Sequence, residues 1–96
     1  MEKKKYAIPH DKVSHCKIIR SEQSEGALEE SLEFQISDTN RRFFIEFSEN
    51  KFQIIDEASG VDLIGFYLMD EEVALELYSH VKSEAVKGIE SILEQL

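Results

Sequence analysis

The sequence predicts an α+β fold, in which an antiparallel sheet of about five strands is followed by one long C-terminal amphipathic helix packed on the sheet. Two patterns lead to this prediction. Between residues 13 and 69, apolar and polar residues alternate in short runs separated by turn residues, as in half-buried strands. From residue 70 onward, apolar residues recur every three or four positions, which is the spacing of one face of a helix.

The first strand is expected at residues 13–20, where alternate residues from Val13 would share one face and Cys16 and Ile18 the other. Neither face is clearly apolar, which indicates an edge strand. Residues 21–30 are polar and contain one glycine, so they predict a loop with room for a helical turn.

The clearest strand is expected at residues 31–37. Within it, Leu32, Phe34 and Ile36 alternate with polar residues, so that one face would be buried and the other exposed to solvent. The following residues Asp-Thr-Asn have the chemistry of a turn, which ends the strand.

A hairpin is predicted next, with strands at residues 41–48 and 51–56 and a two-residue turn between them. That turn makes Phe47 face Phe52 and Ile45 face Ile54, and these four residues then lie on one face together with Phe43. A slip of one residue would put them on opposite faces, so the pattern itself supports the register.

The helix is expected to begin where a long apolar run ends. Residues 61–69 form that run, which predicts a strand covered on both faces, and Gly65 within it indicates a bulge or a close approach of the backbone. Asp70 suits the N-cap position. The helix would then continue to about Gln95, a length of roughly 39 Å.

The chain of 96 residues has the length of one domain. We expect a flexible leader over residues 1–12, which lack periodicity and hold the only proline, and a single α+β domain over residues 13–96. Apolar residues make up 42% of the chain, which is too many for a disordered protein in spite of the net charge of −9.

The cysteine content and the hydropathy indicate in which cellular compartment the protein resides. Cys16 is the only cysteine, so no disulfide can form within the chain, and a reducing compartment is expected. No apolar run approaches the roughly 18 residues that are needed to span a membrane. These features predict a cytoplasmic protein that does not associate with membranes.

The charge is unevenly distributed along the chain. Residues 1–20 hold six Lys or Arg against two acidic residues, a net of +4, whereas the other 76 hold five against eighteen, a net of −13. An acidic body repels nucleic-acid backbones and attracts basic surfaces. We therefore expect a protein partner with a basic surface and no direct nucleic-acid binding, with acidity for solubility alone as the alternative.

The residue patterns contain no motif that indicates a catalytic, metal-binding or phosphate-binding site. His10, His15 and Cys16 lie close together in the sequence, but zinc needs three or four converging ligands, and neighbours in a strand point to opposite faces. Cys16 has no local signature of a nucleophile, and the glycines form no phosphate-binding loop. We expect no cofactor, no metal and no catalytic residue, and hence a protein that is not an enzyme.

Two groups of residues are expected to bind partners. In the predicted hairpin, Phe44 would point away from the core beside Arg42 and Glu46, and an outward aromatic flanked by charges is a common interface anchor. The apolar stripe of the helix would continue past the end of a sheet of short strands, which predicts a homodimer through its distal part. The stripe residues there are Ile89, Ile92, Leu93 and Leu96.

The segment 63–82 (LIGFYLMDEEVALELYSHVK) resembles the end of a pleckstrin-homology-like domain, where a strand runs into an acidic cap and an amphipathic helix. Ran-binding domains are similar in this respect. The resemblance covers about a fifth of the chain. It raises the question of whether the sheet closes into a barrel, because those families use seven strands and this chain has room for about five.

Three classes of function follow, and the first is favoured. It is a small, non-enzymatic, acidic protein-binding domain of the inhibitor, immunity or adaptor type, which acts by stoichiometric association. The second is a nucleic-acid mimic that inhibits a nucleic-acid-binding protein, with carboxylates in place of phosphates. The third is a small ligand-binding or enzymatic domain with a pocket between sheet and helix, to which Tyr67, Tyr78 and His80 would contribute.

Overall fold

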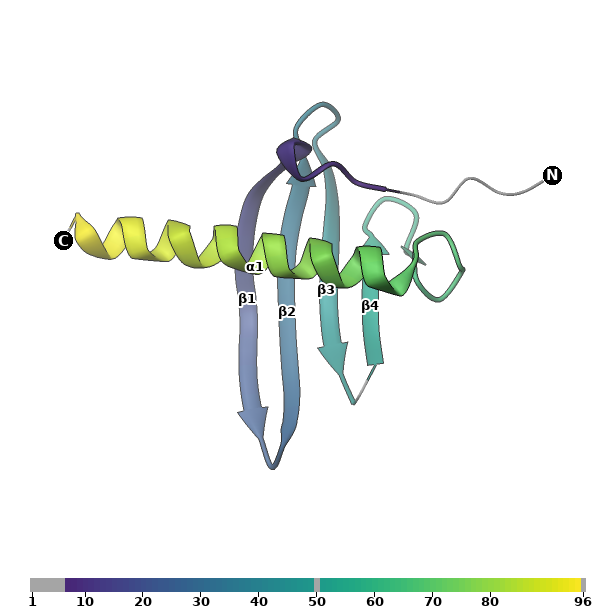
Figure 1. Ribbon diagram of the computed structural model, residues 1–96, viewed down its shortest axis with the longest axis horizontal. Coiled ribbons are helices and arrows are strands. Elements are labelled where there is room, and N and C mark those ends of the chain that lie inside the picture. Colours follow the sequence, from purple (N-terminus) through teal and green to yellow (C-terminus); the bar gives the residue numbers. More distant parts are fainter. Residues whose placement is uncertain (1–6, 50, 96) are drawn as a thin grey trace.

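A computed structural model describes residues 7–49 and 51–95 of the chain. Within these residues, five antiparallel strands form one sheet in the order of the sequence, and a single α-helix crosses one face of it (Figure 1). The predicted α+β fold is therefore confirmed. The elements are the 3-10 helix η1 (His10–Lys12), the strands β1 (Val13–Ser24), β2 (Ala27–Ile36), β3 (Arg41–Ser48), β4 (Lys51–Asp56) and β5 (Val61–Asp62), and the helix α1 (Glu71–Glu94).

The β3–β4 hairpin has the predicted register. Phe47 lies opposite Phe52, and their rings stack with centroids 4.4 Å apart. Ile45 lies opposite Ile54, and both side chains are fully buried beneath α1. Because both strands alternate in phase, one face of the hairpin carries five of its apolar residues, and the other carries mostly polar residues together with Phe44 and Ile55.

The predicted loop at residues 21–30 is wrong, because these residues form the two arms of a β1–β2 hairpin. Ser24 pairs with Ala27, so the turn consists of Glu25 and Gly26 alone. Their φ values of +50° and +80° are those of a type I′ turn, which suits the twist of a hairpin. The arms are polar because this ribbon extends beyond the helix, so the alternation that marks a half-buried strand is missing (Figure 1).

The predicted alternation of β1 is also wrong. The pairing of β1 with β2 shifts twice, between Ser14 and Lys17 and again between Ile18 and Arg20, and His15 has a φ of +53°. Each bulge changes the phase of the strand. As a result Val13, Cys16 and Ile18 all pack against the core instead of alternating across the sheet.

The start of α1 is close to its predicted position, but the strand before it is not. Asp70 is the N-cap residue, in extended conformation, although its carboxylate makes no capping hydrogen bond. The nine-residue strand expected at residues 61–69 is reduced to Val61–Asp62, and the rest of the run is a compact loop. Two residues of that loop, Leu63 and Met69, are buried in the core, which accounts for its apolar composition.

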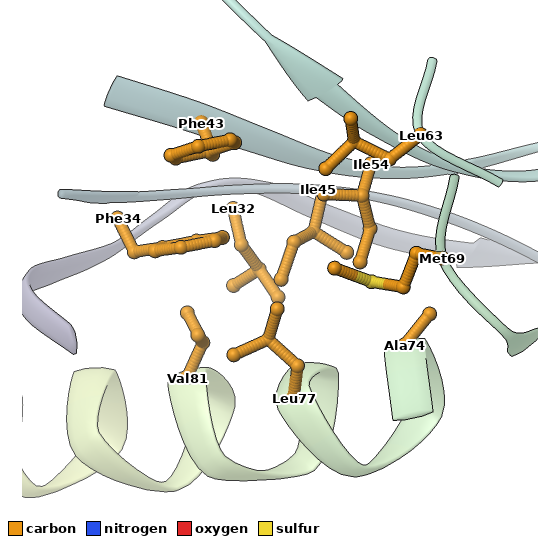
Figure 2. Close-up of a cluster of buried hydrophobic side chains, with 10 residues drawn as sticks. All are labelled: Leu32, Phe34, Phe43, Ile45, Ile54, Leu63, Met69, Ala74, Leu77 and Val81. Atoms are coloured by element: carbon orange, nitrogen blue, oxygen red, sulfur yellow. The ribbon is translucent and has the colours of Figure 1, made fainter. Parts of the chain in front are cut away.

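The core lies between the sheet and one stripe of α1. Figure 2 shows Phe34, Ile45 and their neighbours on the strands facing Leu77 and Val81 on the helix. The buried cluster consists of Leu32, Phe34, Phe43, Ile45, Ile54, Leu63, Met69, Ala74, Leu77 and Val81.

The sheet that the described strands form is open and does not close into a barrel. The strand order makes β1 and β5 the two opposite edges among the described strands. The segment that precedes α1 is a loop rather than a closing strand. Over residues 7–49 and 51–95, the structure therefore lacks the closed arrangement that the pleckstrin-homology-like resemblance implies.

The N-terminal segment is described only in part. Residues 1–6 of the expected leader lie outside the described residues. Farther along, Ile8 packs against the core, and the carbonyl of Lys12 accepts hydrogen bonds from both the amide and the hydroxyl of Ser37, at 2.9 and 3.0 Å. His10 stacks on His80 of α1 with ring centroids 4.5 Å apart. These contacts attach residues 8–12 to the sheet and the helix.

Candidate functional site

The loop of residues 63–69, called the aromatic loop below, is fixed at both of its ends. Leu63 and Met69 are 4% and 2% exposed, so both ends are held in the core. The amides of Leu68 and Met69 donate hydrogen bonds to the carbonyl of Leu63, at 2.8 and 3.0 Å. The loop is thereby closed by hydrogen bonds of its own backbone.

Asp62 organises the interior of the aromatic loop. Its carboxylate accepts a hydrogen bond from the amide of Ile64 at 3.1 Å, and its carbonyl accepts one from the amide of Phe66 at 3.0 Å. A Cβ atom on Gly65 would lie only 2.6 Å from the Asp62 carboxylate. The predicted close approach at Gly65 is therefore real, and it is made to a side chain rather than to another strand.

The tip of the aromatic loop presents two aromatic side chains to solvent. Phe66 is 67% exposed and Tyr67 is 82% exposed. Tyr67 also has a φ of +58°, in the left-handed region that costs a residue with a Cβ about 1–2 kcal/mol. Neither the exposure nor the strain contributes to folding, and features of that kind cluster at binding sites.

We expect Tyr67→Gly to leave the protein as stable as the wild type or to stabilise it by up to about 1 kcal/mol, because glycine removes the left-handed strain at the cost of some unfolded-state entropy. Tyr67→Ala is the matched control, because it removes the same ring but keeps the strain. Urea denaturation of the three proteins compares their free energies of unfolding. A Tyr67→Gly protein clearly less stable than Tyr67→Ala would show that the backbone is not strained here.

Acidic residues follow the aromatic tip directly. Asp70, Glu71 and Glu72 occupy the N-cap and first turn of α1, and all three are exposed. Carboxylates at this end of a helix are favoured by its dipole, so their presence alone does not indicate binding. Next to two exposed aromatic rings, however, they make the surface complementary to a basic surface with an apolar depression.

The first group of predicted binding residues lies on the sheet face away from α1. There Phe44 is half-buried and pairs across the sheet with Ile55. Arg42 is in ion-pair range of two carboxylates, at 3.7 Å from Glu33 and 3.3 Å from Glu57. Phe44 is thus less exposed than the aromatic tip, and the charge of Arg42 is already balanced within the sheet. Glu46 lies on the same face and is half-buried.

The second group lies on the distal part of α1. Ile89 is 48% exposed, and Ile92 and Leu93 are each 62% exposed. Leu96 lies outside the described residues. Because this part of the helix extends past β1, the structure does not bring it together with Phe44 (Figure 1).

The residues considered for catalysis or ligand binding do not converge. Tyr67 is exposed on the aromatic loop, Tyr78 donates a hydrogen bond to Glu30 at 2.5 Å, and His80 stacks on His10. Burial and the nearby carboxylate of Glu84 raise the pKa of Cys16 to about 11, which keeps the thiol protonated at neutral pH. In the part of the chain that the structure describes, no three His, Cys, Asp or Glu side chains gather as metal ligands would.

A buried polar network joins the sheet to α1. The Glu30 side chain is fully buried and accepts hydrogen bonds from Tyr78 at 2.5 Å, Lys82 at 2.8 Å and Ser21 at 2.7 Å. Burial opposes the ionisation of Glu30, but the hydrogen bonds from Lys82, Tyr78 and Ser21 outweigh it and hold the pKa of this carboxyl below its ordinary value. Since these groups satisfy one another, the network is structural in character.

The aromatic loop differs from the strand that the sequence predicts, because the nearly continuous apolar run at residues 61–69 is typical of a buried strand. The signal that could have revealed it is Gly65 directly before Phe66 and Tyr67, since glycine weakens a strand and marks irregular backbone. Which residues of such a run are buried cannot be read from composition alone, because all of them from Leu63 to Met69 except Gly65 are large and mainly apolar.

In comparisons with family models, with curated proteins and with solved structures, no match to this chain is found. Among the helices of residues 7–49 and 51–95, none combines the length and apolar character that crossing a bilayer requires.

Proposed function

We propose that this protein is a small non-enzymatic binding domain of the inhibitor, immunity or adaptor type, which associates stoichiometrically with a protein that has a basic surface. The observation that carries the proposal is the aromatic tip, Phe66 and Tyr67, held outward by a closed loop beside three exposed carboxylates. Rigid exposed aromatic residues are the usual anchors of protein interfaces, because they bury a large area at little entropic cost.

Two further observations support binding rather than catalysis. The space between sheet and helix, where a ligand-binding or enzymatic domain would need its pocket, is filled by Leu32, Phe34 and Leu77, which are at most 1% exposed. The Cys16 thiol, with its raised pKa, is poorly suited to nucleophilic attack.

The second class, nucleic-acid mimicry, has less support. On the sheet face away from α1, acidic residues lie in ion-pair range of basic ones. The buried Glu33 lies 3.4 Å from Lys17, and the half-buried Glu29 lies 2.9 Å from Arg20. Carboxylates that are balanced in this way are poor substitutes for the unpaired phosphates of a nucleic acid. For location we propose the cytoplasm, since the single half-buried Cys16 needs no oxidising compartment.

The proposal is tested with a Phe66→Ala/Tyr67→Ala double variant. We expect it to lose at least about 30-fold in affinity for the partner, which corresponds to the 2 kcal/mol that defines an interface hot spot. Leu75→Ala is the control, because Leu75 is also an exposed apolar residue, 42% exposed, but lies on α1. Partners captured from the native cell by the wild type would be identified by mass spectrometry and titrated by calorimetry against all three proteins.

Three results would count against the proposal. The first is that no captured partner binds stoichiometrically, and the second is that the double variant binds as tightly as the wild type. The third is an affinity that does not fall with added salt, because attraction between an acidic surface and a basic partner is screened by ions.

A further inference from the structure

The aromatic loop contains a single helical turn that begins at Asp62. The amide of Phe66 donates to the carbonyl of Asp62 at 3.0 Å, which is the hydrogen bond of one α-helical turn. The carboxylate of Asp62 accepts from the amide of Ile64 at 3.1 Å, as the side chain of an N-cap residue does with the second residue of a helix. Asp62 therefore starts this turn in the way that an N-cap residue starts a longer helix.

The turn ends in the hydrogen-bond pattern of a Schellman motif. The amide of Leu68 donates to the carbonyl of Leu63 at 2.8 Å, and the amide of Tyr67 donates to that of Ile64 at 3.0 Å. Tyr67, with its φ of +58°, occupies the left-handed position that glycine usually takes in this motif. Leu68 packs against the core to which Leu63 belongs, as the next residue often does in such caps. Both ends of the turn are thus capped.

Gly65 lies inside the turn and leaves room for the Asp62 carboxylate. A Cβ atom at Gly65 would lie 2.6 Å from one carboxylate oxygen, which is closer than such atoms approach in real structures. The φ of Gly65 is not in the left-handed region, so this contact, and not the backbone, is what disfavours alanine here. Gln53 donates to the same oxygen at 3.4 Å. The carboxylate cannot move aside without disturbing these contacts.

The connection of β5 to α1 does not require an ordered tip. The two ends of the aromatic loop are already held by Leu63 and Met69, which are 4% and 2% exposed. Phe66 and Tyr67 lie mostly in solvent, so a fixed orientation of their rings adds nothing to the packing of the core. Recognition therefore explains the two caps better than stability does.

We propose that Asp62 and Gly65 are positioning residues of the aromatic tip, which hold Phe66 and Tyr67 in the free protein in the orientation that binds the partner. This rests on the proposed function, because it concerns the same tip. Asp62 acts through its hydrogen bonds to the turn, and Gly65 acts by leaving space for the carboxylate. Side chains that are ordered before association lose less conformational entropy when they bind, so the capped turn raises the affinity.

Backbone nitrogen-15 relaxation of the full chain, measured without a partner, tests the positioning. In the wild type the amides of Phe66 and Tyr67 should have order parameters of about 0.85, the value of rigid backbone. Asp62→Ala removes the capping carboxylate and Gly65→Ala displaces it, so each should lower these values toward about 0.6. Asp62→Asn should keep them high, because an amide oxygen caps a helix equally well. Gly88→Ala is the matched control, since no atom lies within 4 Å of its Cβ position.

The effects of the two residues should be coupled. In an Asp62→Ala background the carboxylate oxygen is absent, and the remaining Cβ atom of residue 62 lies 3.7 Å from the Cβ position of Gly65, an ordinary contact distance. Gly65→Ala should therefore cause no further loss of order in that background. Effects that add up would show that the two residues act independently.

Calorimetric titration measures the consequence for binding, with the purified protein that the wild type captures from the native cell as the probe. Asp62→Ala and Gly65→Ala should each weaken binding about fivefold, which corresponds to the roughly 1 kcal/mol of a lost cap. Asp62→Asn should bind like the wild type. In a Phe66→Ala/Tyr67→Ala background, Asp62→Ala should have no further effect, because it acts only through the two rings. A residue that merely stabilised the fold would not show this dependence on the rings.

The two measurements separate this proposal from the proposed function. A mobile tip in the wild type, an ordered tip in Asp62→Ala, or an undiminished affinity of Asp62→Ala would overturn the positioning role, even if Phe66→Ala/Tyr67→Ala loses the partner. A tip that depends on Asp62 for its order, together with a Phe66→Ala/Tyr67→Ala protein that binds as tightly as the wild type, would overturn the proposed function. The binding role of the turn would fall with it, while the ordering of the tip by Asp62 would stand.

Discussion

Phe34→Ala is expected to destabilise the protein by about 3–5 kcal/mol, which is the usual cost of deleting a fully buried phenylalanine. Phe34 has no exposed surface, and its ring stacks on Phe43 with centroids 5.1 Å apart. Figure 2 shows the ring between the strands and Val81 of α1, so alanine would leave a cavity in the layer that joins sheet to helix. Domains of this size have a total stability of only about 5–15 kcal/mol, so the variant should be close to unfolding.

Chemical denaturation followed by circular dichroism measures this loss. Phe66→Ala is the matched control, because it makes the same substitution at a side chain that is 67% exposed, and it should change the stability by no more than about 0.5 kcal/mol. If the two variants were equally stable, the packing of the sheet on the helix as described would be incorrect.

Lys82→Met is expected to cost about 3 kcal/mol, at the lower end of the range for breaking a buried ion pair, because Lys82 itself keeps contact with water. The fully buried carboxylate of Glu30 lies 2.8 Å from the Lys82 ammonium, and no other cation lies in ion-pair range of it among the described residues. Methionine keeps most of the volume of the lysine stem but removes its charge. The variant is therefore left with a buried carboxylate that only Tyr78 and Ser21 can stabilise.

The stability lost in Lys82→Met should depend on pH, and the pKa of Glu30 determines the direction of this dependence. In the wild type the pKa of Glu30 is lowered, so the stability due to this group is present above the ordinary glutamate pKa of about 4.3 and is lost as the pH falls through the lowered pKa. In Lys82→Met the pKa of Glu30 rises relative to the wild type. The difference in stability between the two proteins should therefore be largest at neutral pH and should narrow as the pH falls through the higher pKa of the variant, where Glu30 is protonated in the variant but still ionised in the wild type.

Urea denaturation at neutral pH and at about pH 4 measures this difference. Lys87→Met is the control, because Lys87 is an exposed lysine on the same helix that lies 3.5 Å from Glu84, and such pairs contribute at most about 1 kcal/mol. A gap between wild type and Lys82→Met that is constant with pH would show that Glu30 does not depend on Lys82 for its charge.

The sequence alone determined the features that depend on local periodicity. Alternation in residues 31–37 indicated the strand β2, and the phase of the two strands around Glu49 determined the register of the β3–β4 hairpin, because a one-residue slip would expose Phe52. The spacing of apolar residues after Asp70 likewise determined α1 almost to its last residue. In each case one face carries mainly apolar residues and the other mainly polar ones, so the order of residue types indicates which face packs on the core.

Only the tertiary structure decided the features in which that order is ambiguous. The polar arms of the β1–β2 hairpin lie beyond the helix, so no buried face marks them, and the bulges of β1 change the phase of the strand without any signal in its composition. The apolar run at residues 61–69 could be a strand or a loop, because its two anchors in the core and its two exposed aromatic residues are all apolar. Which of them is buried depends on where α1 crosses the sheet, and that depends on contacts between residues far apart in the chain.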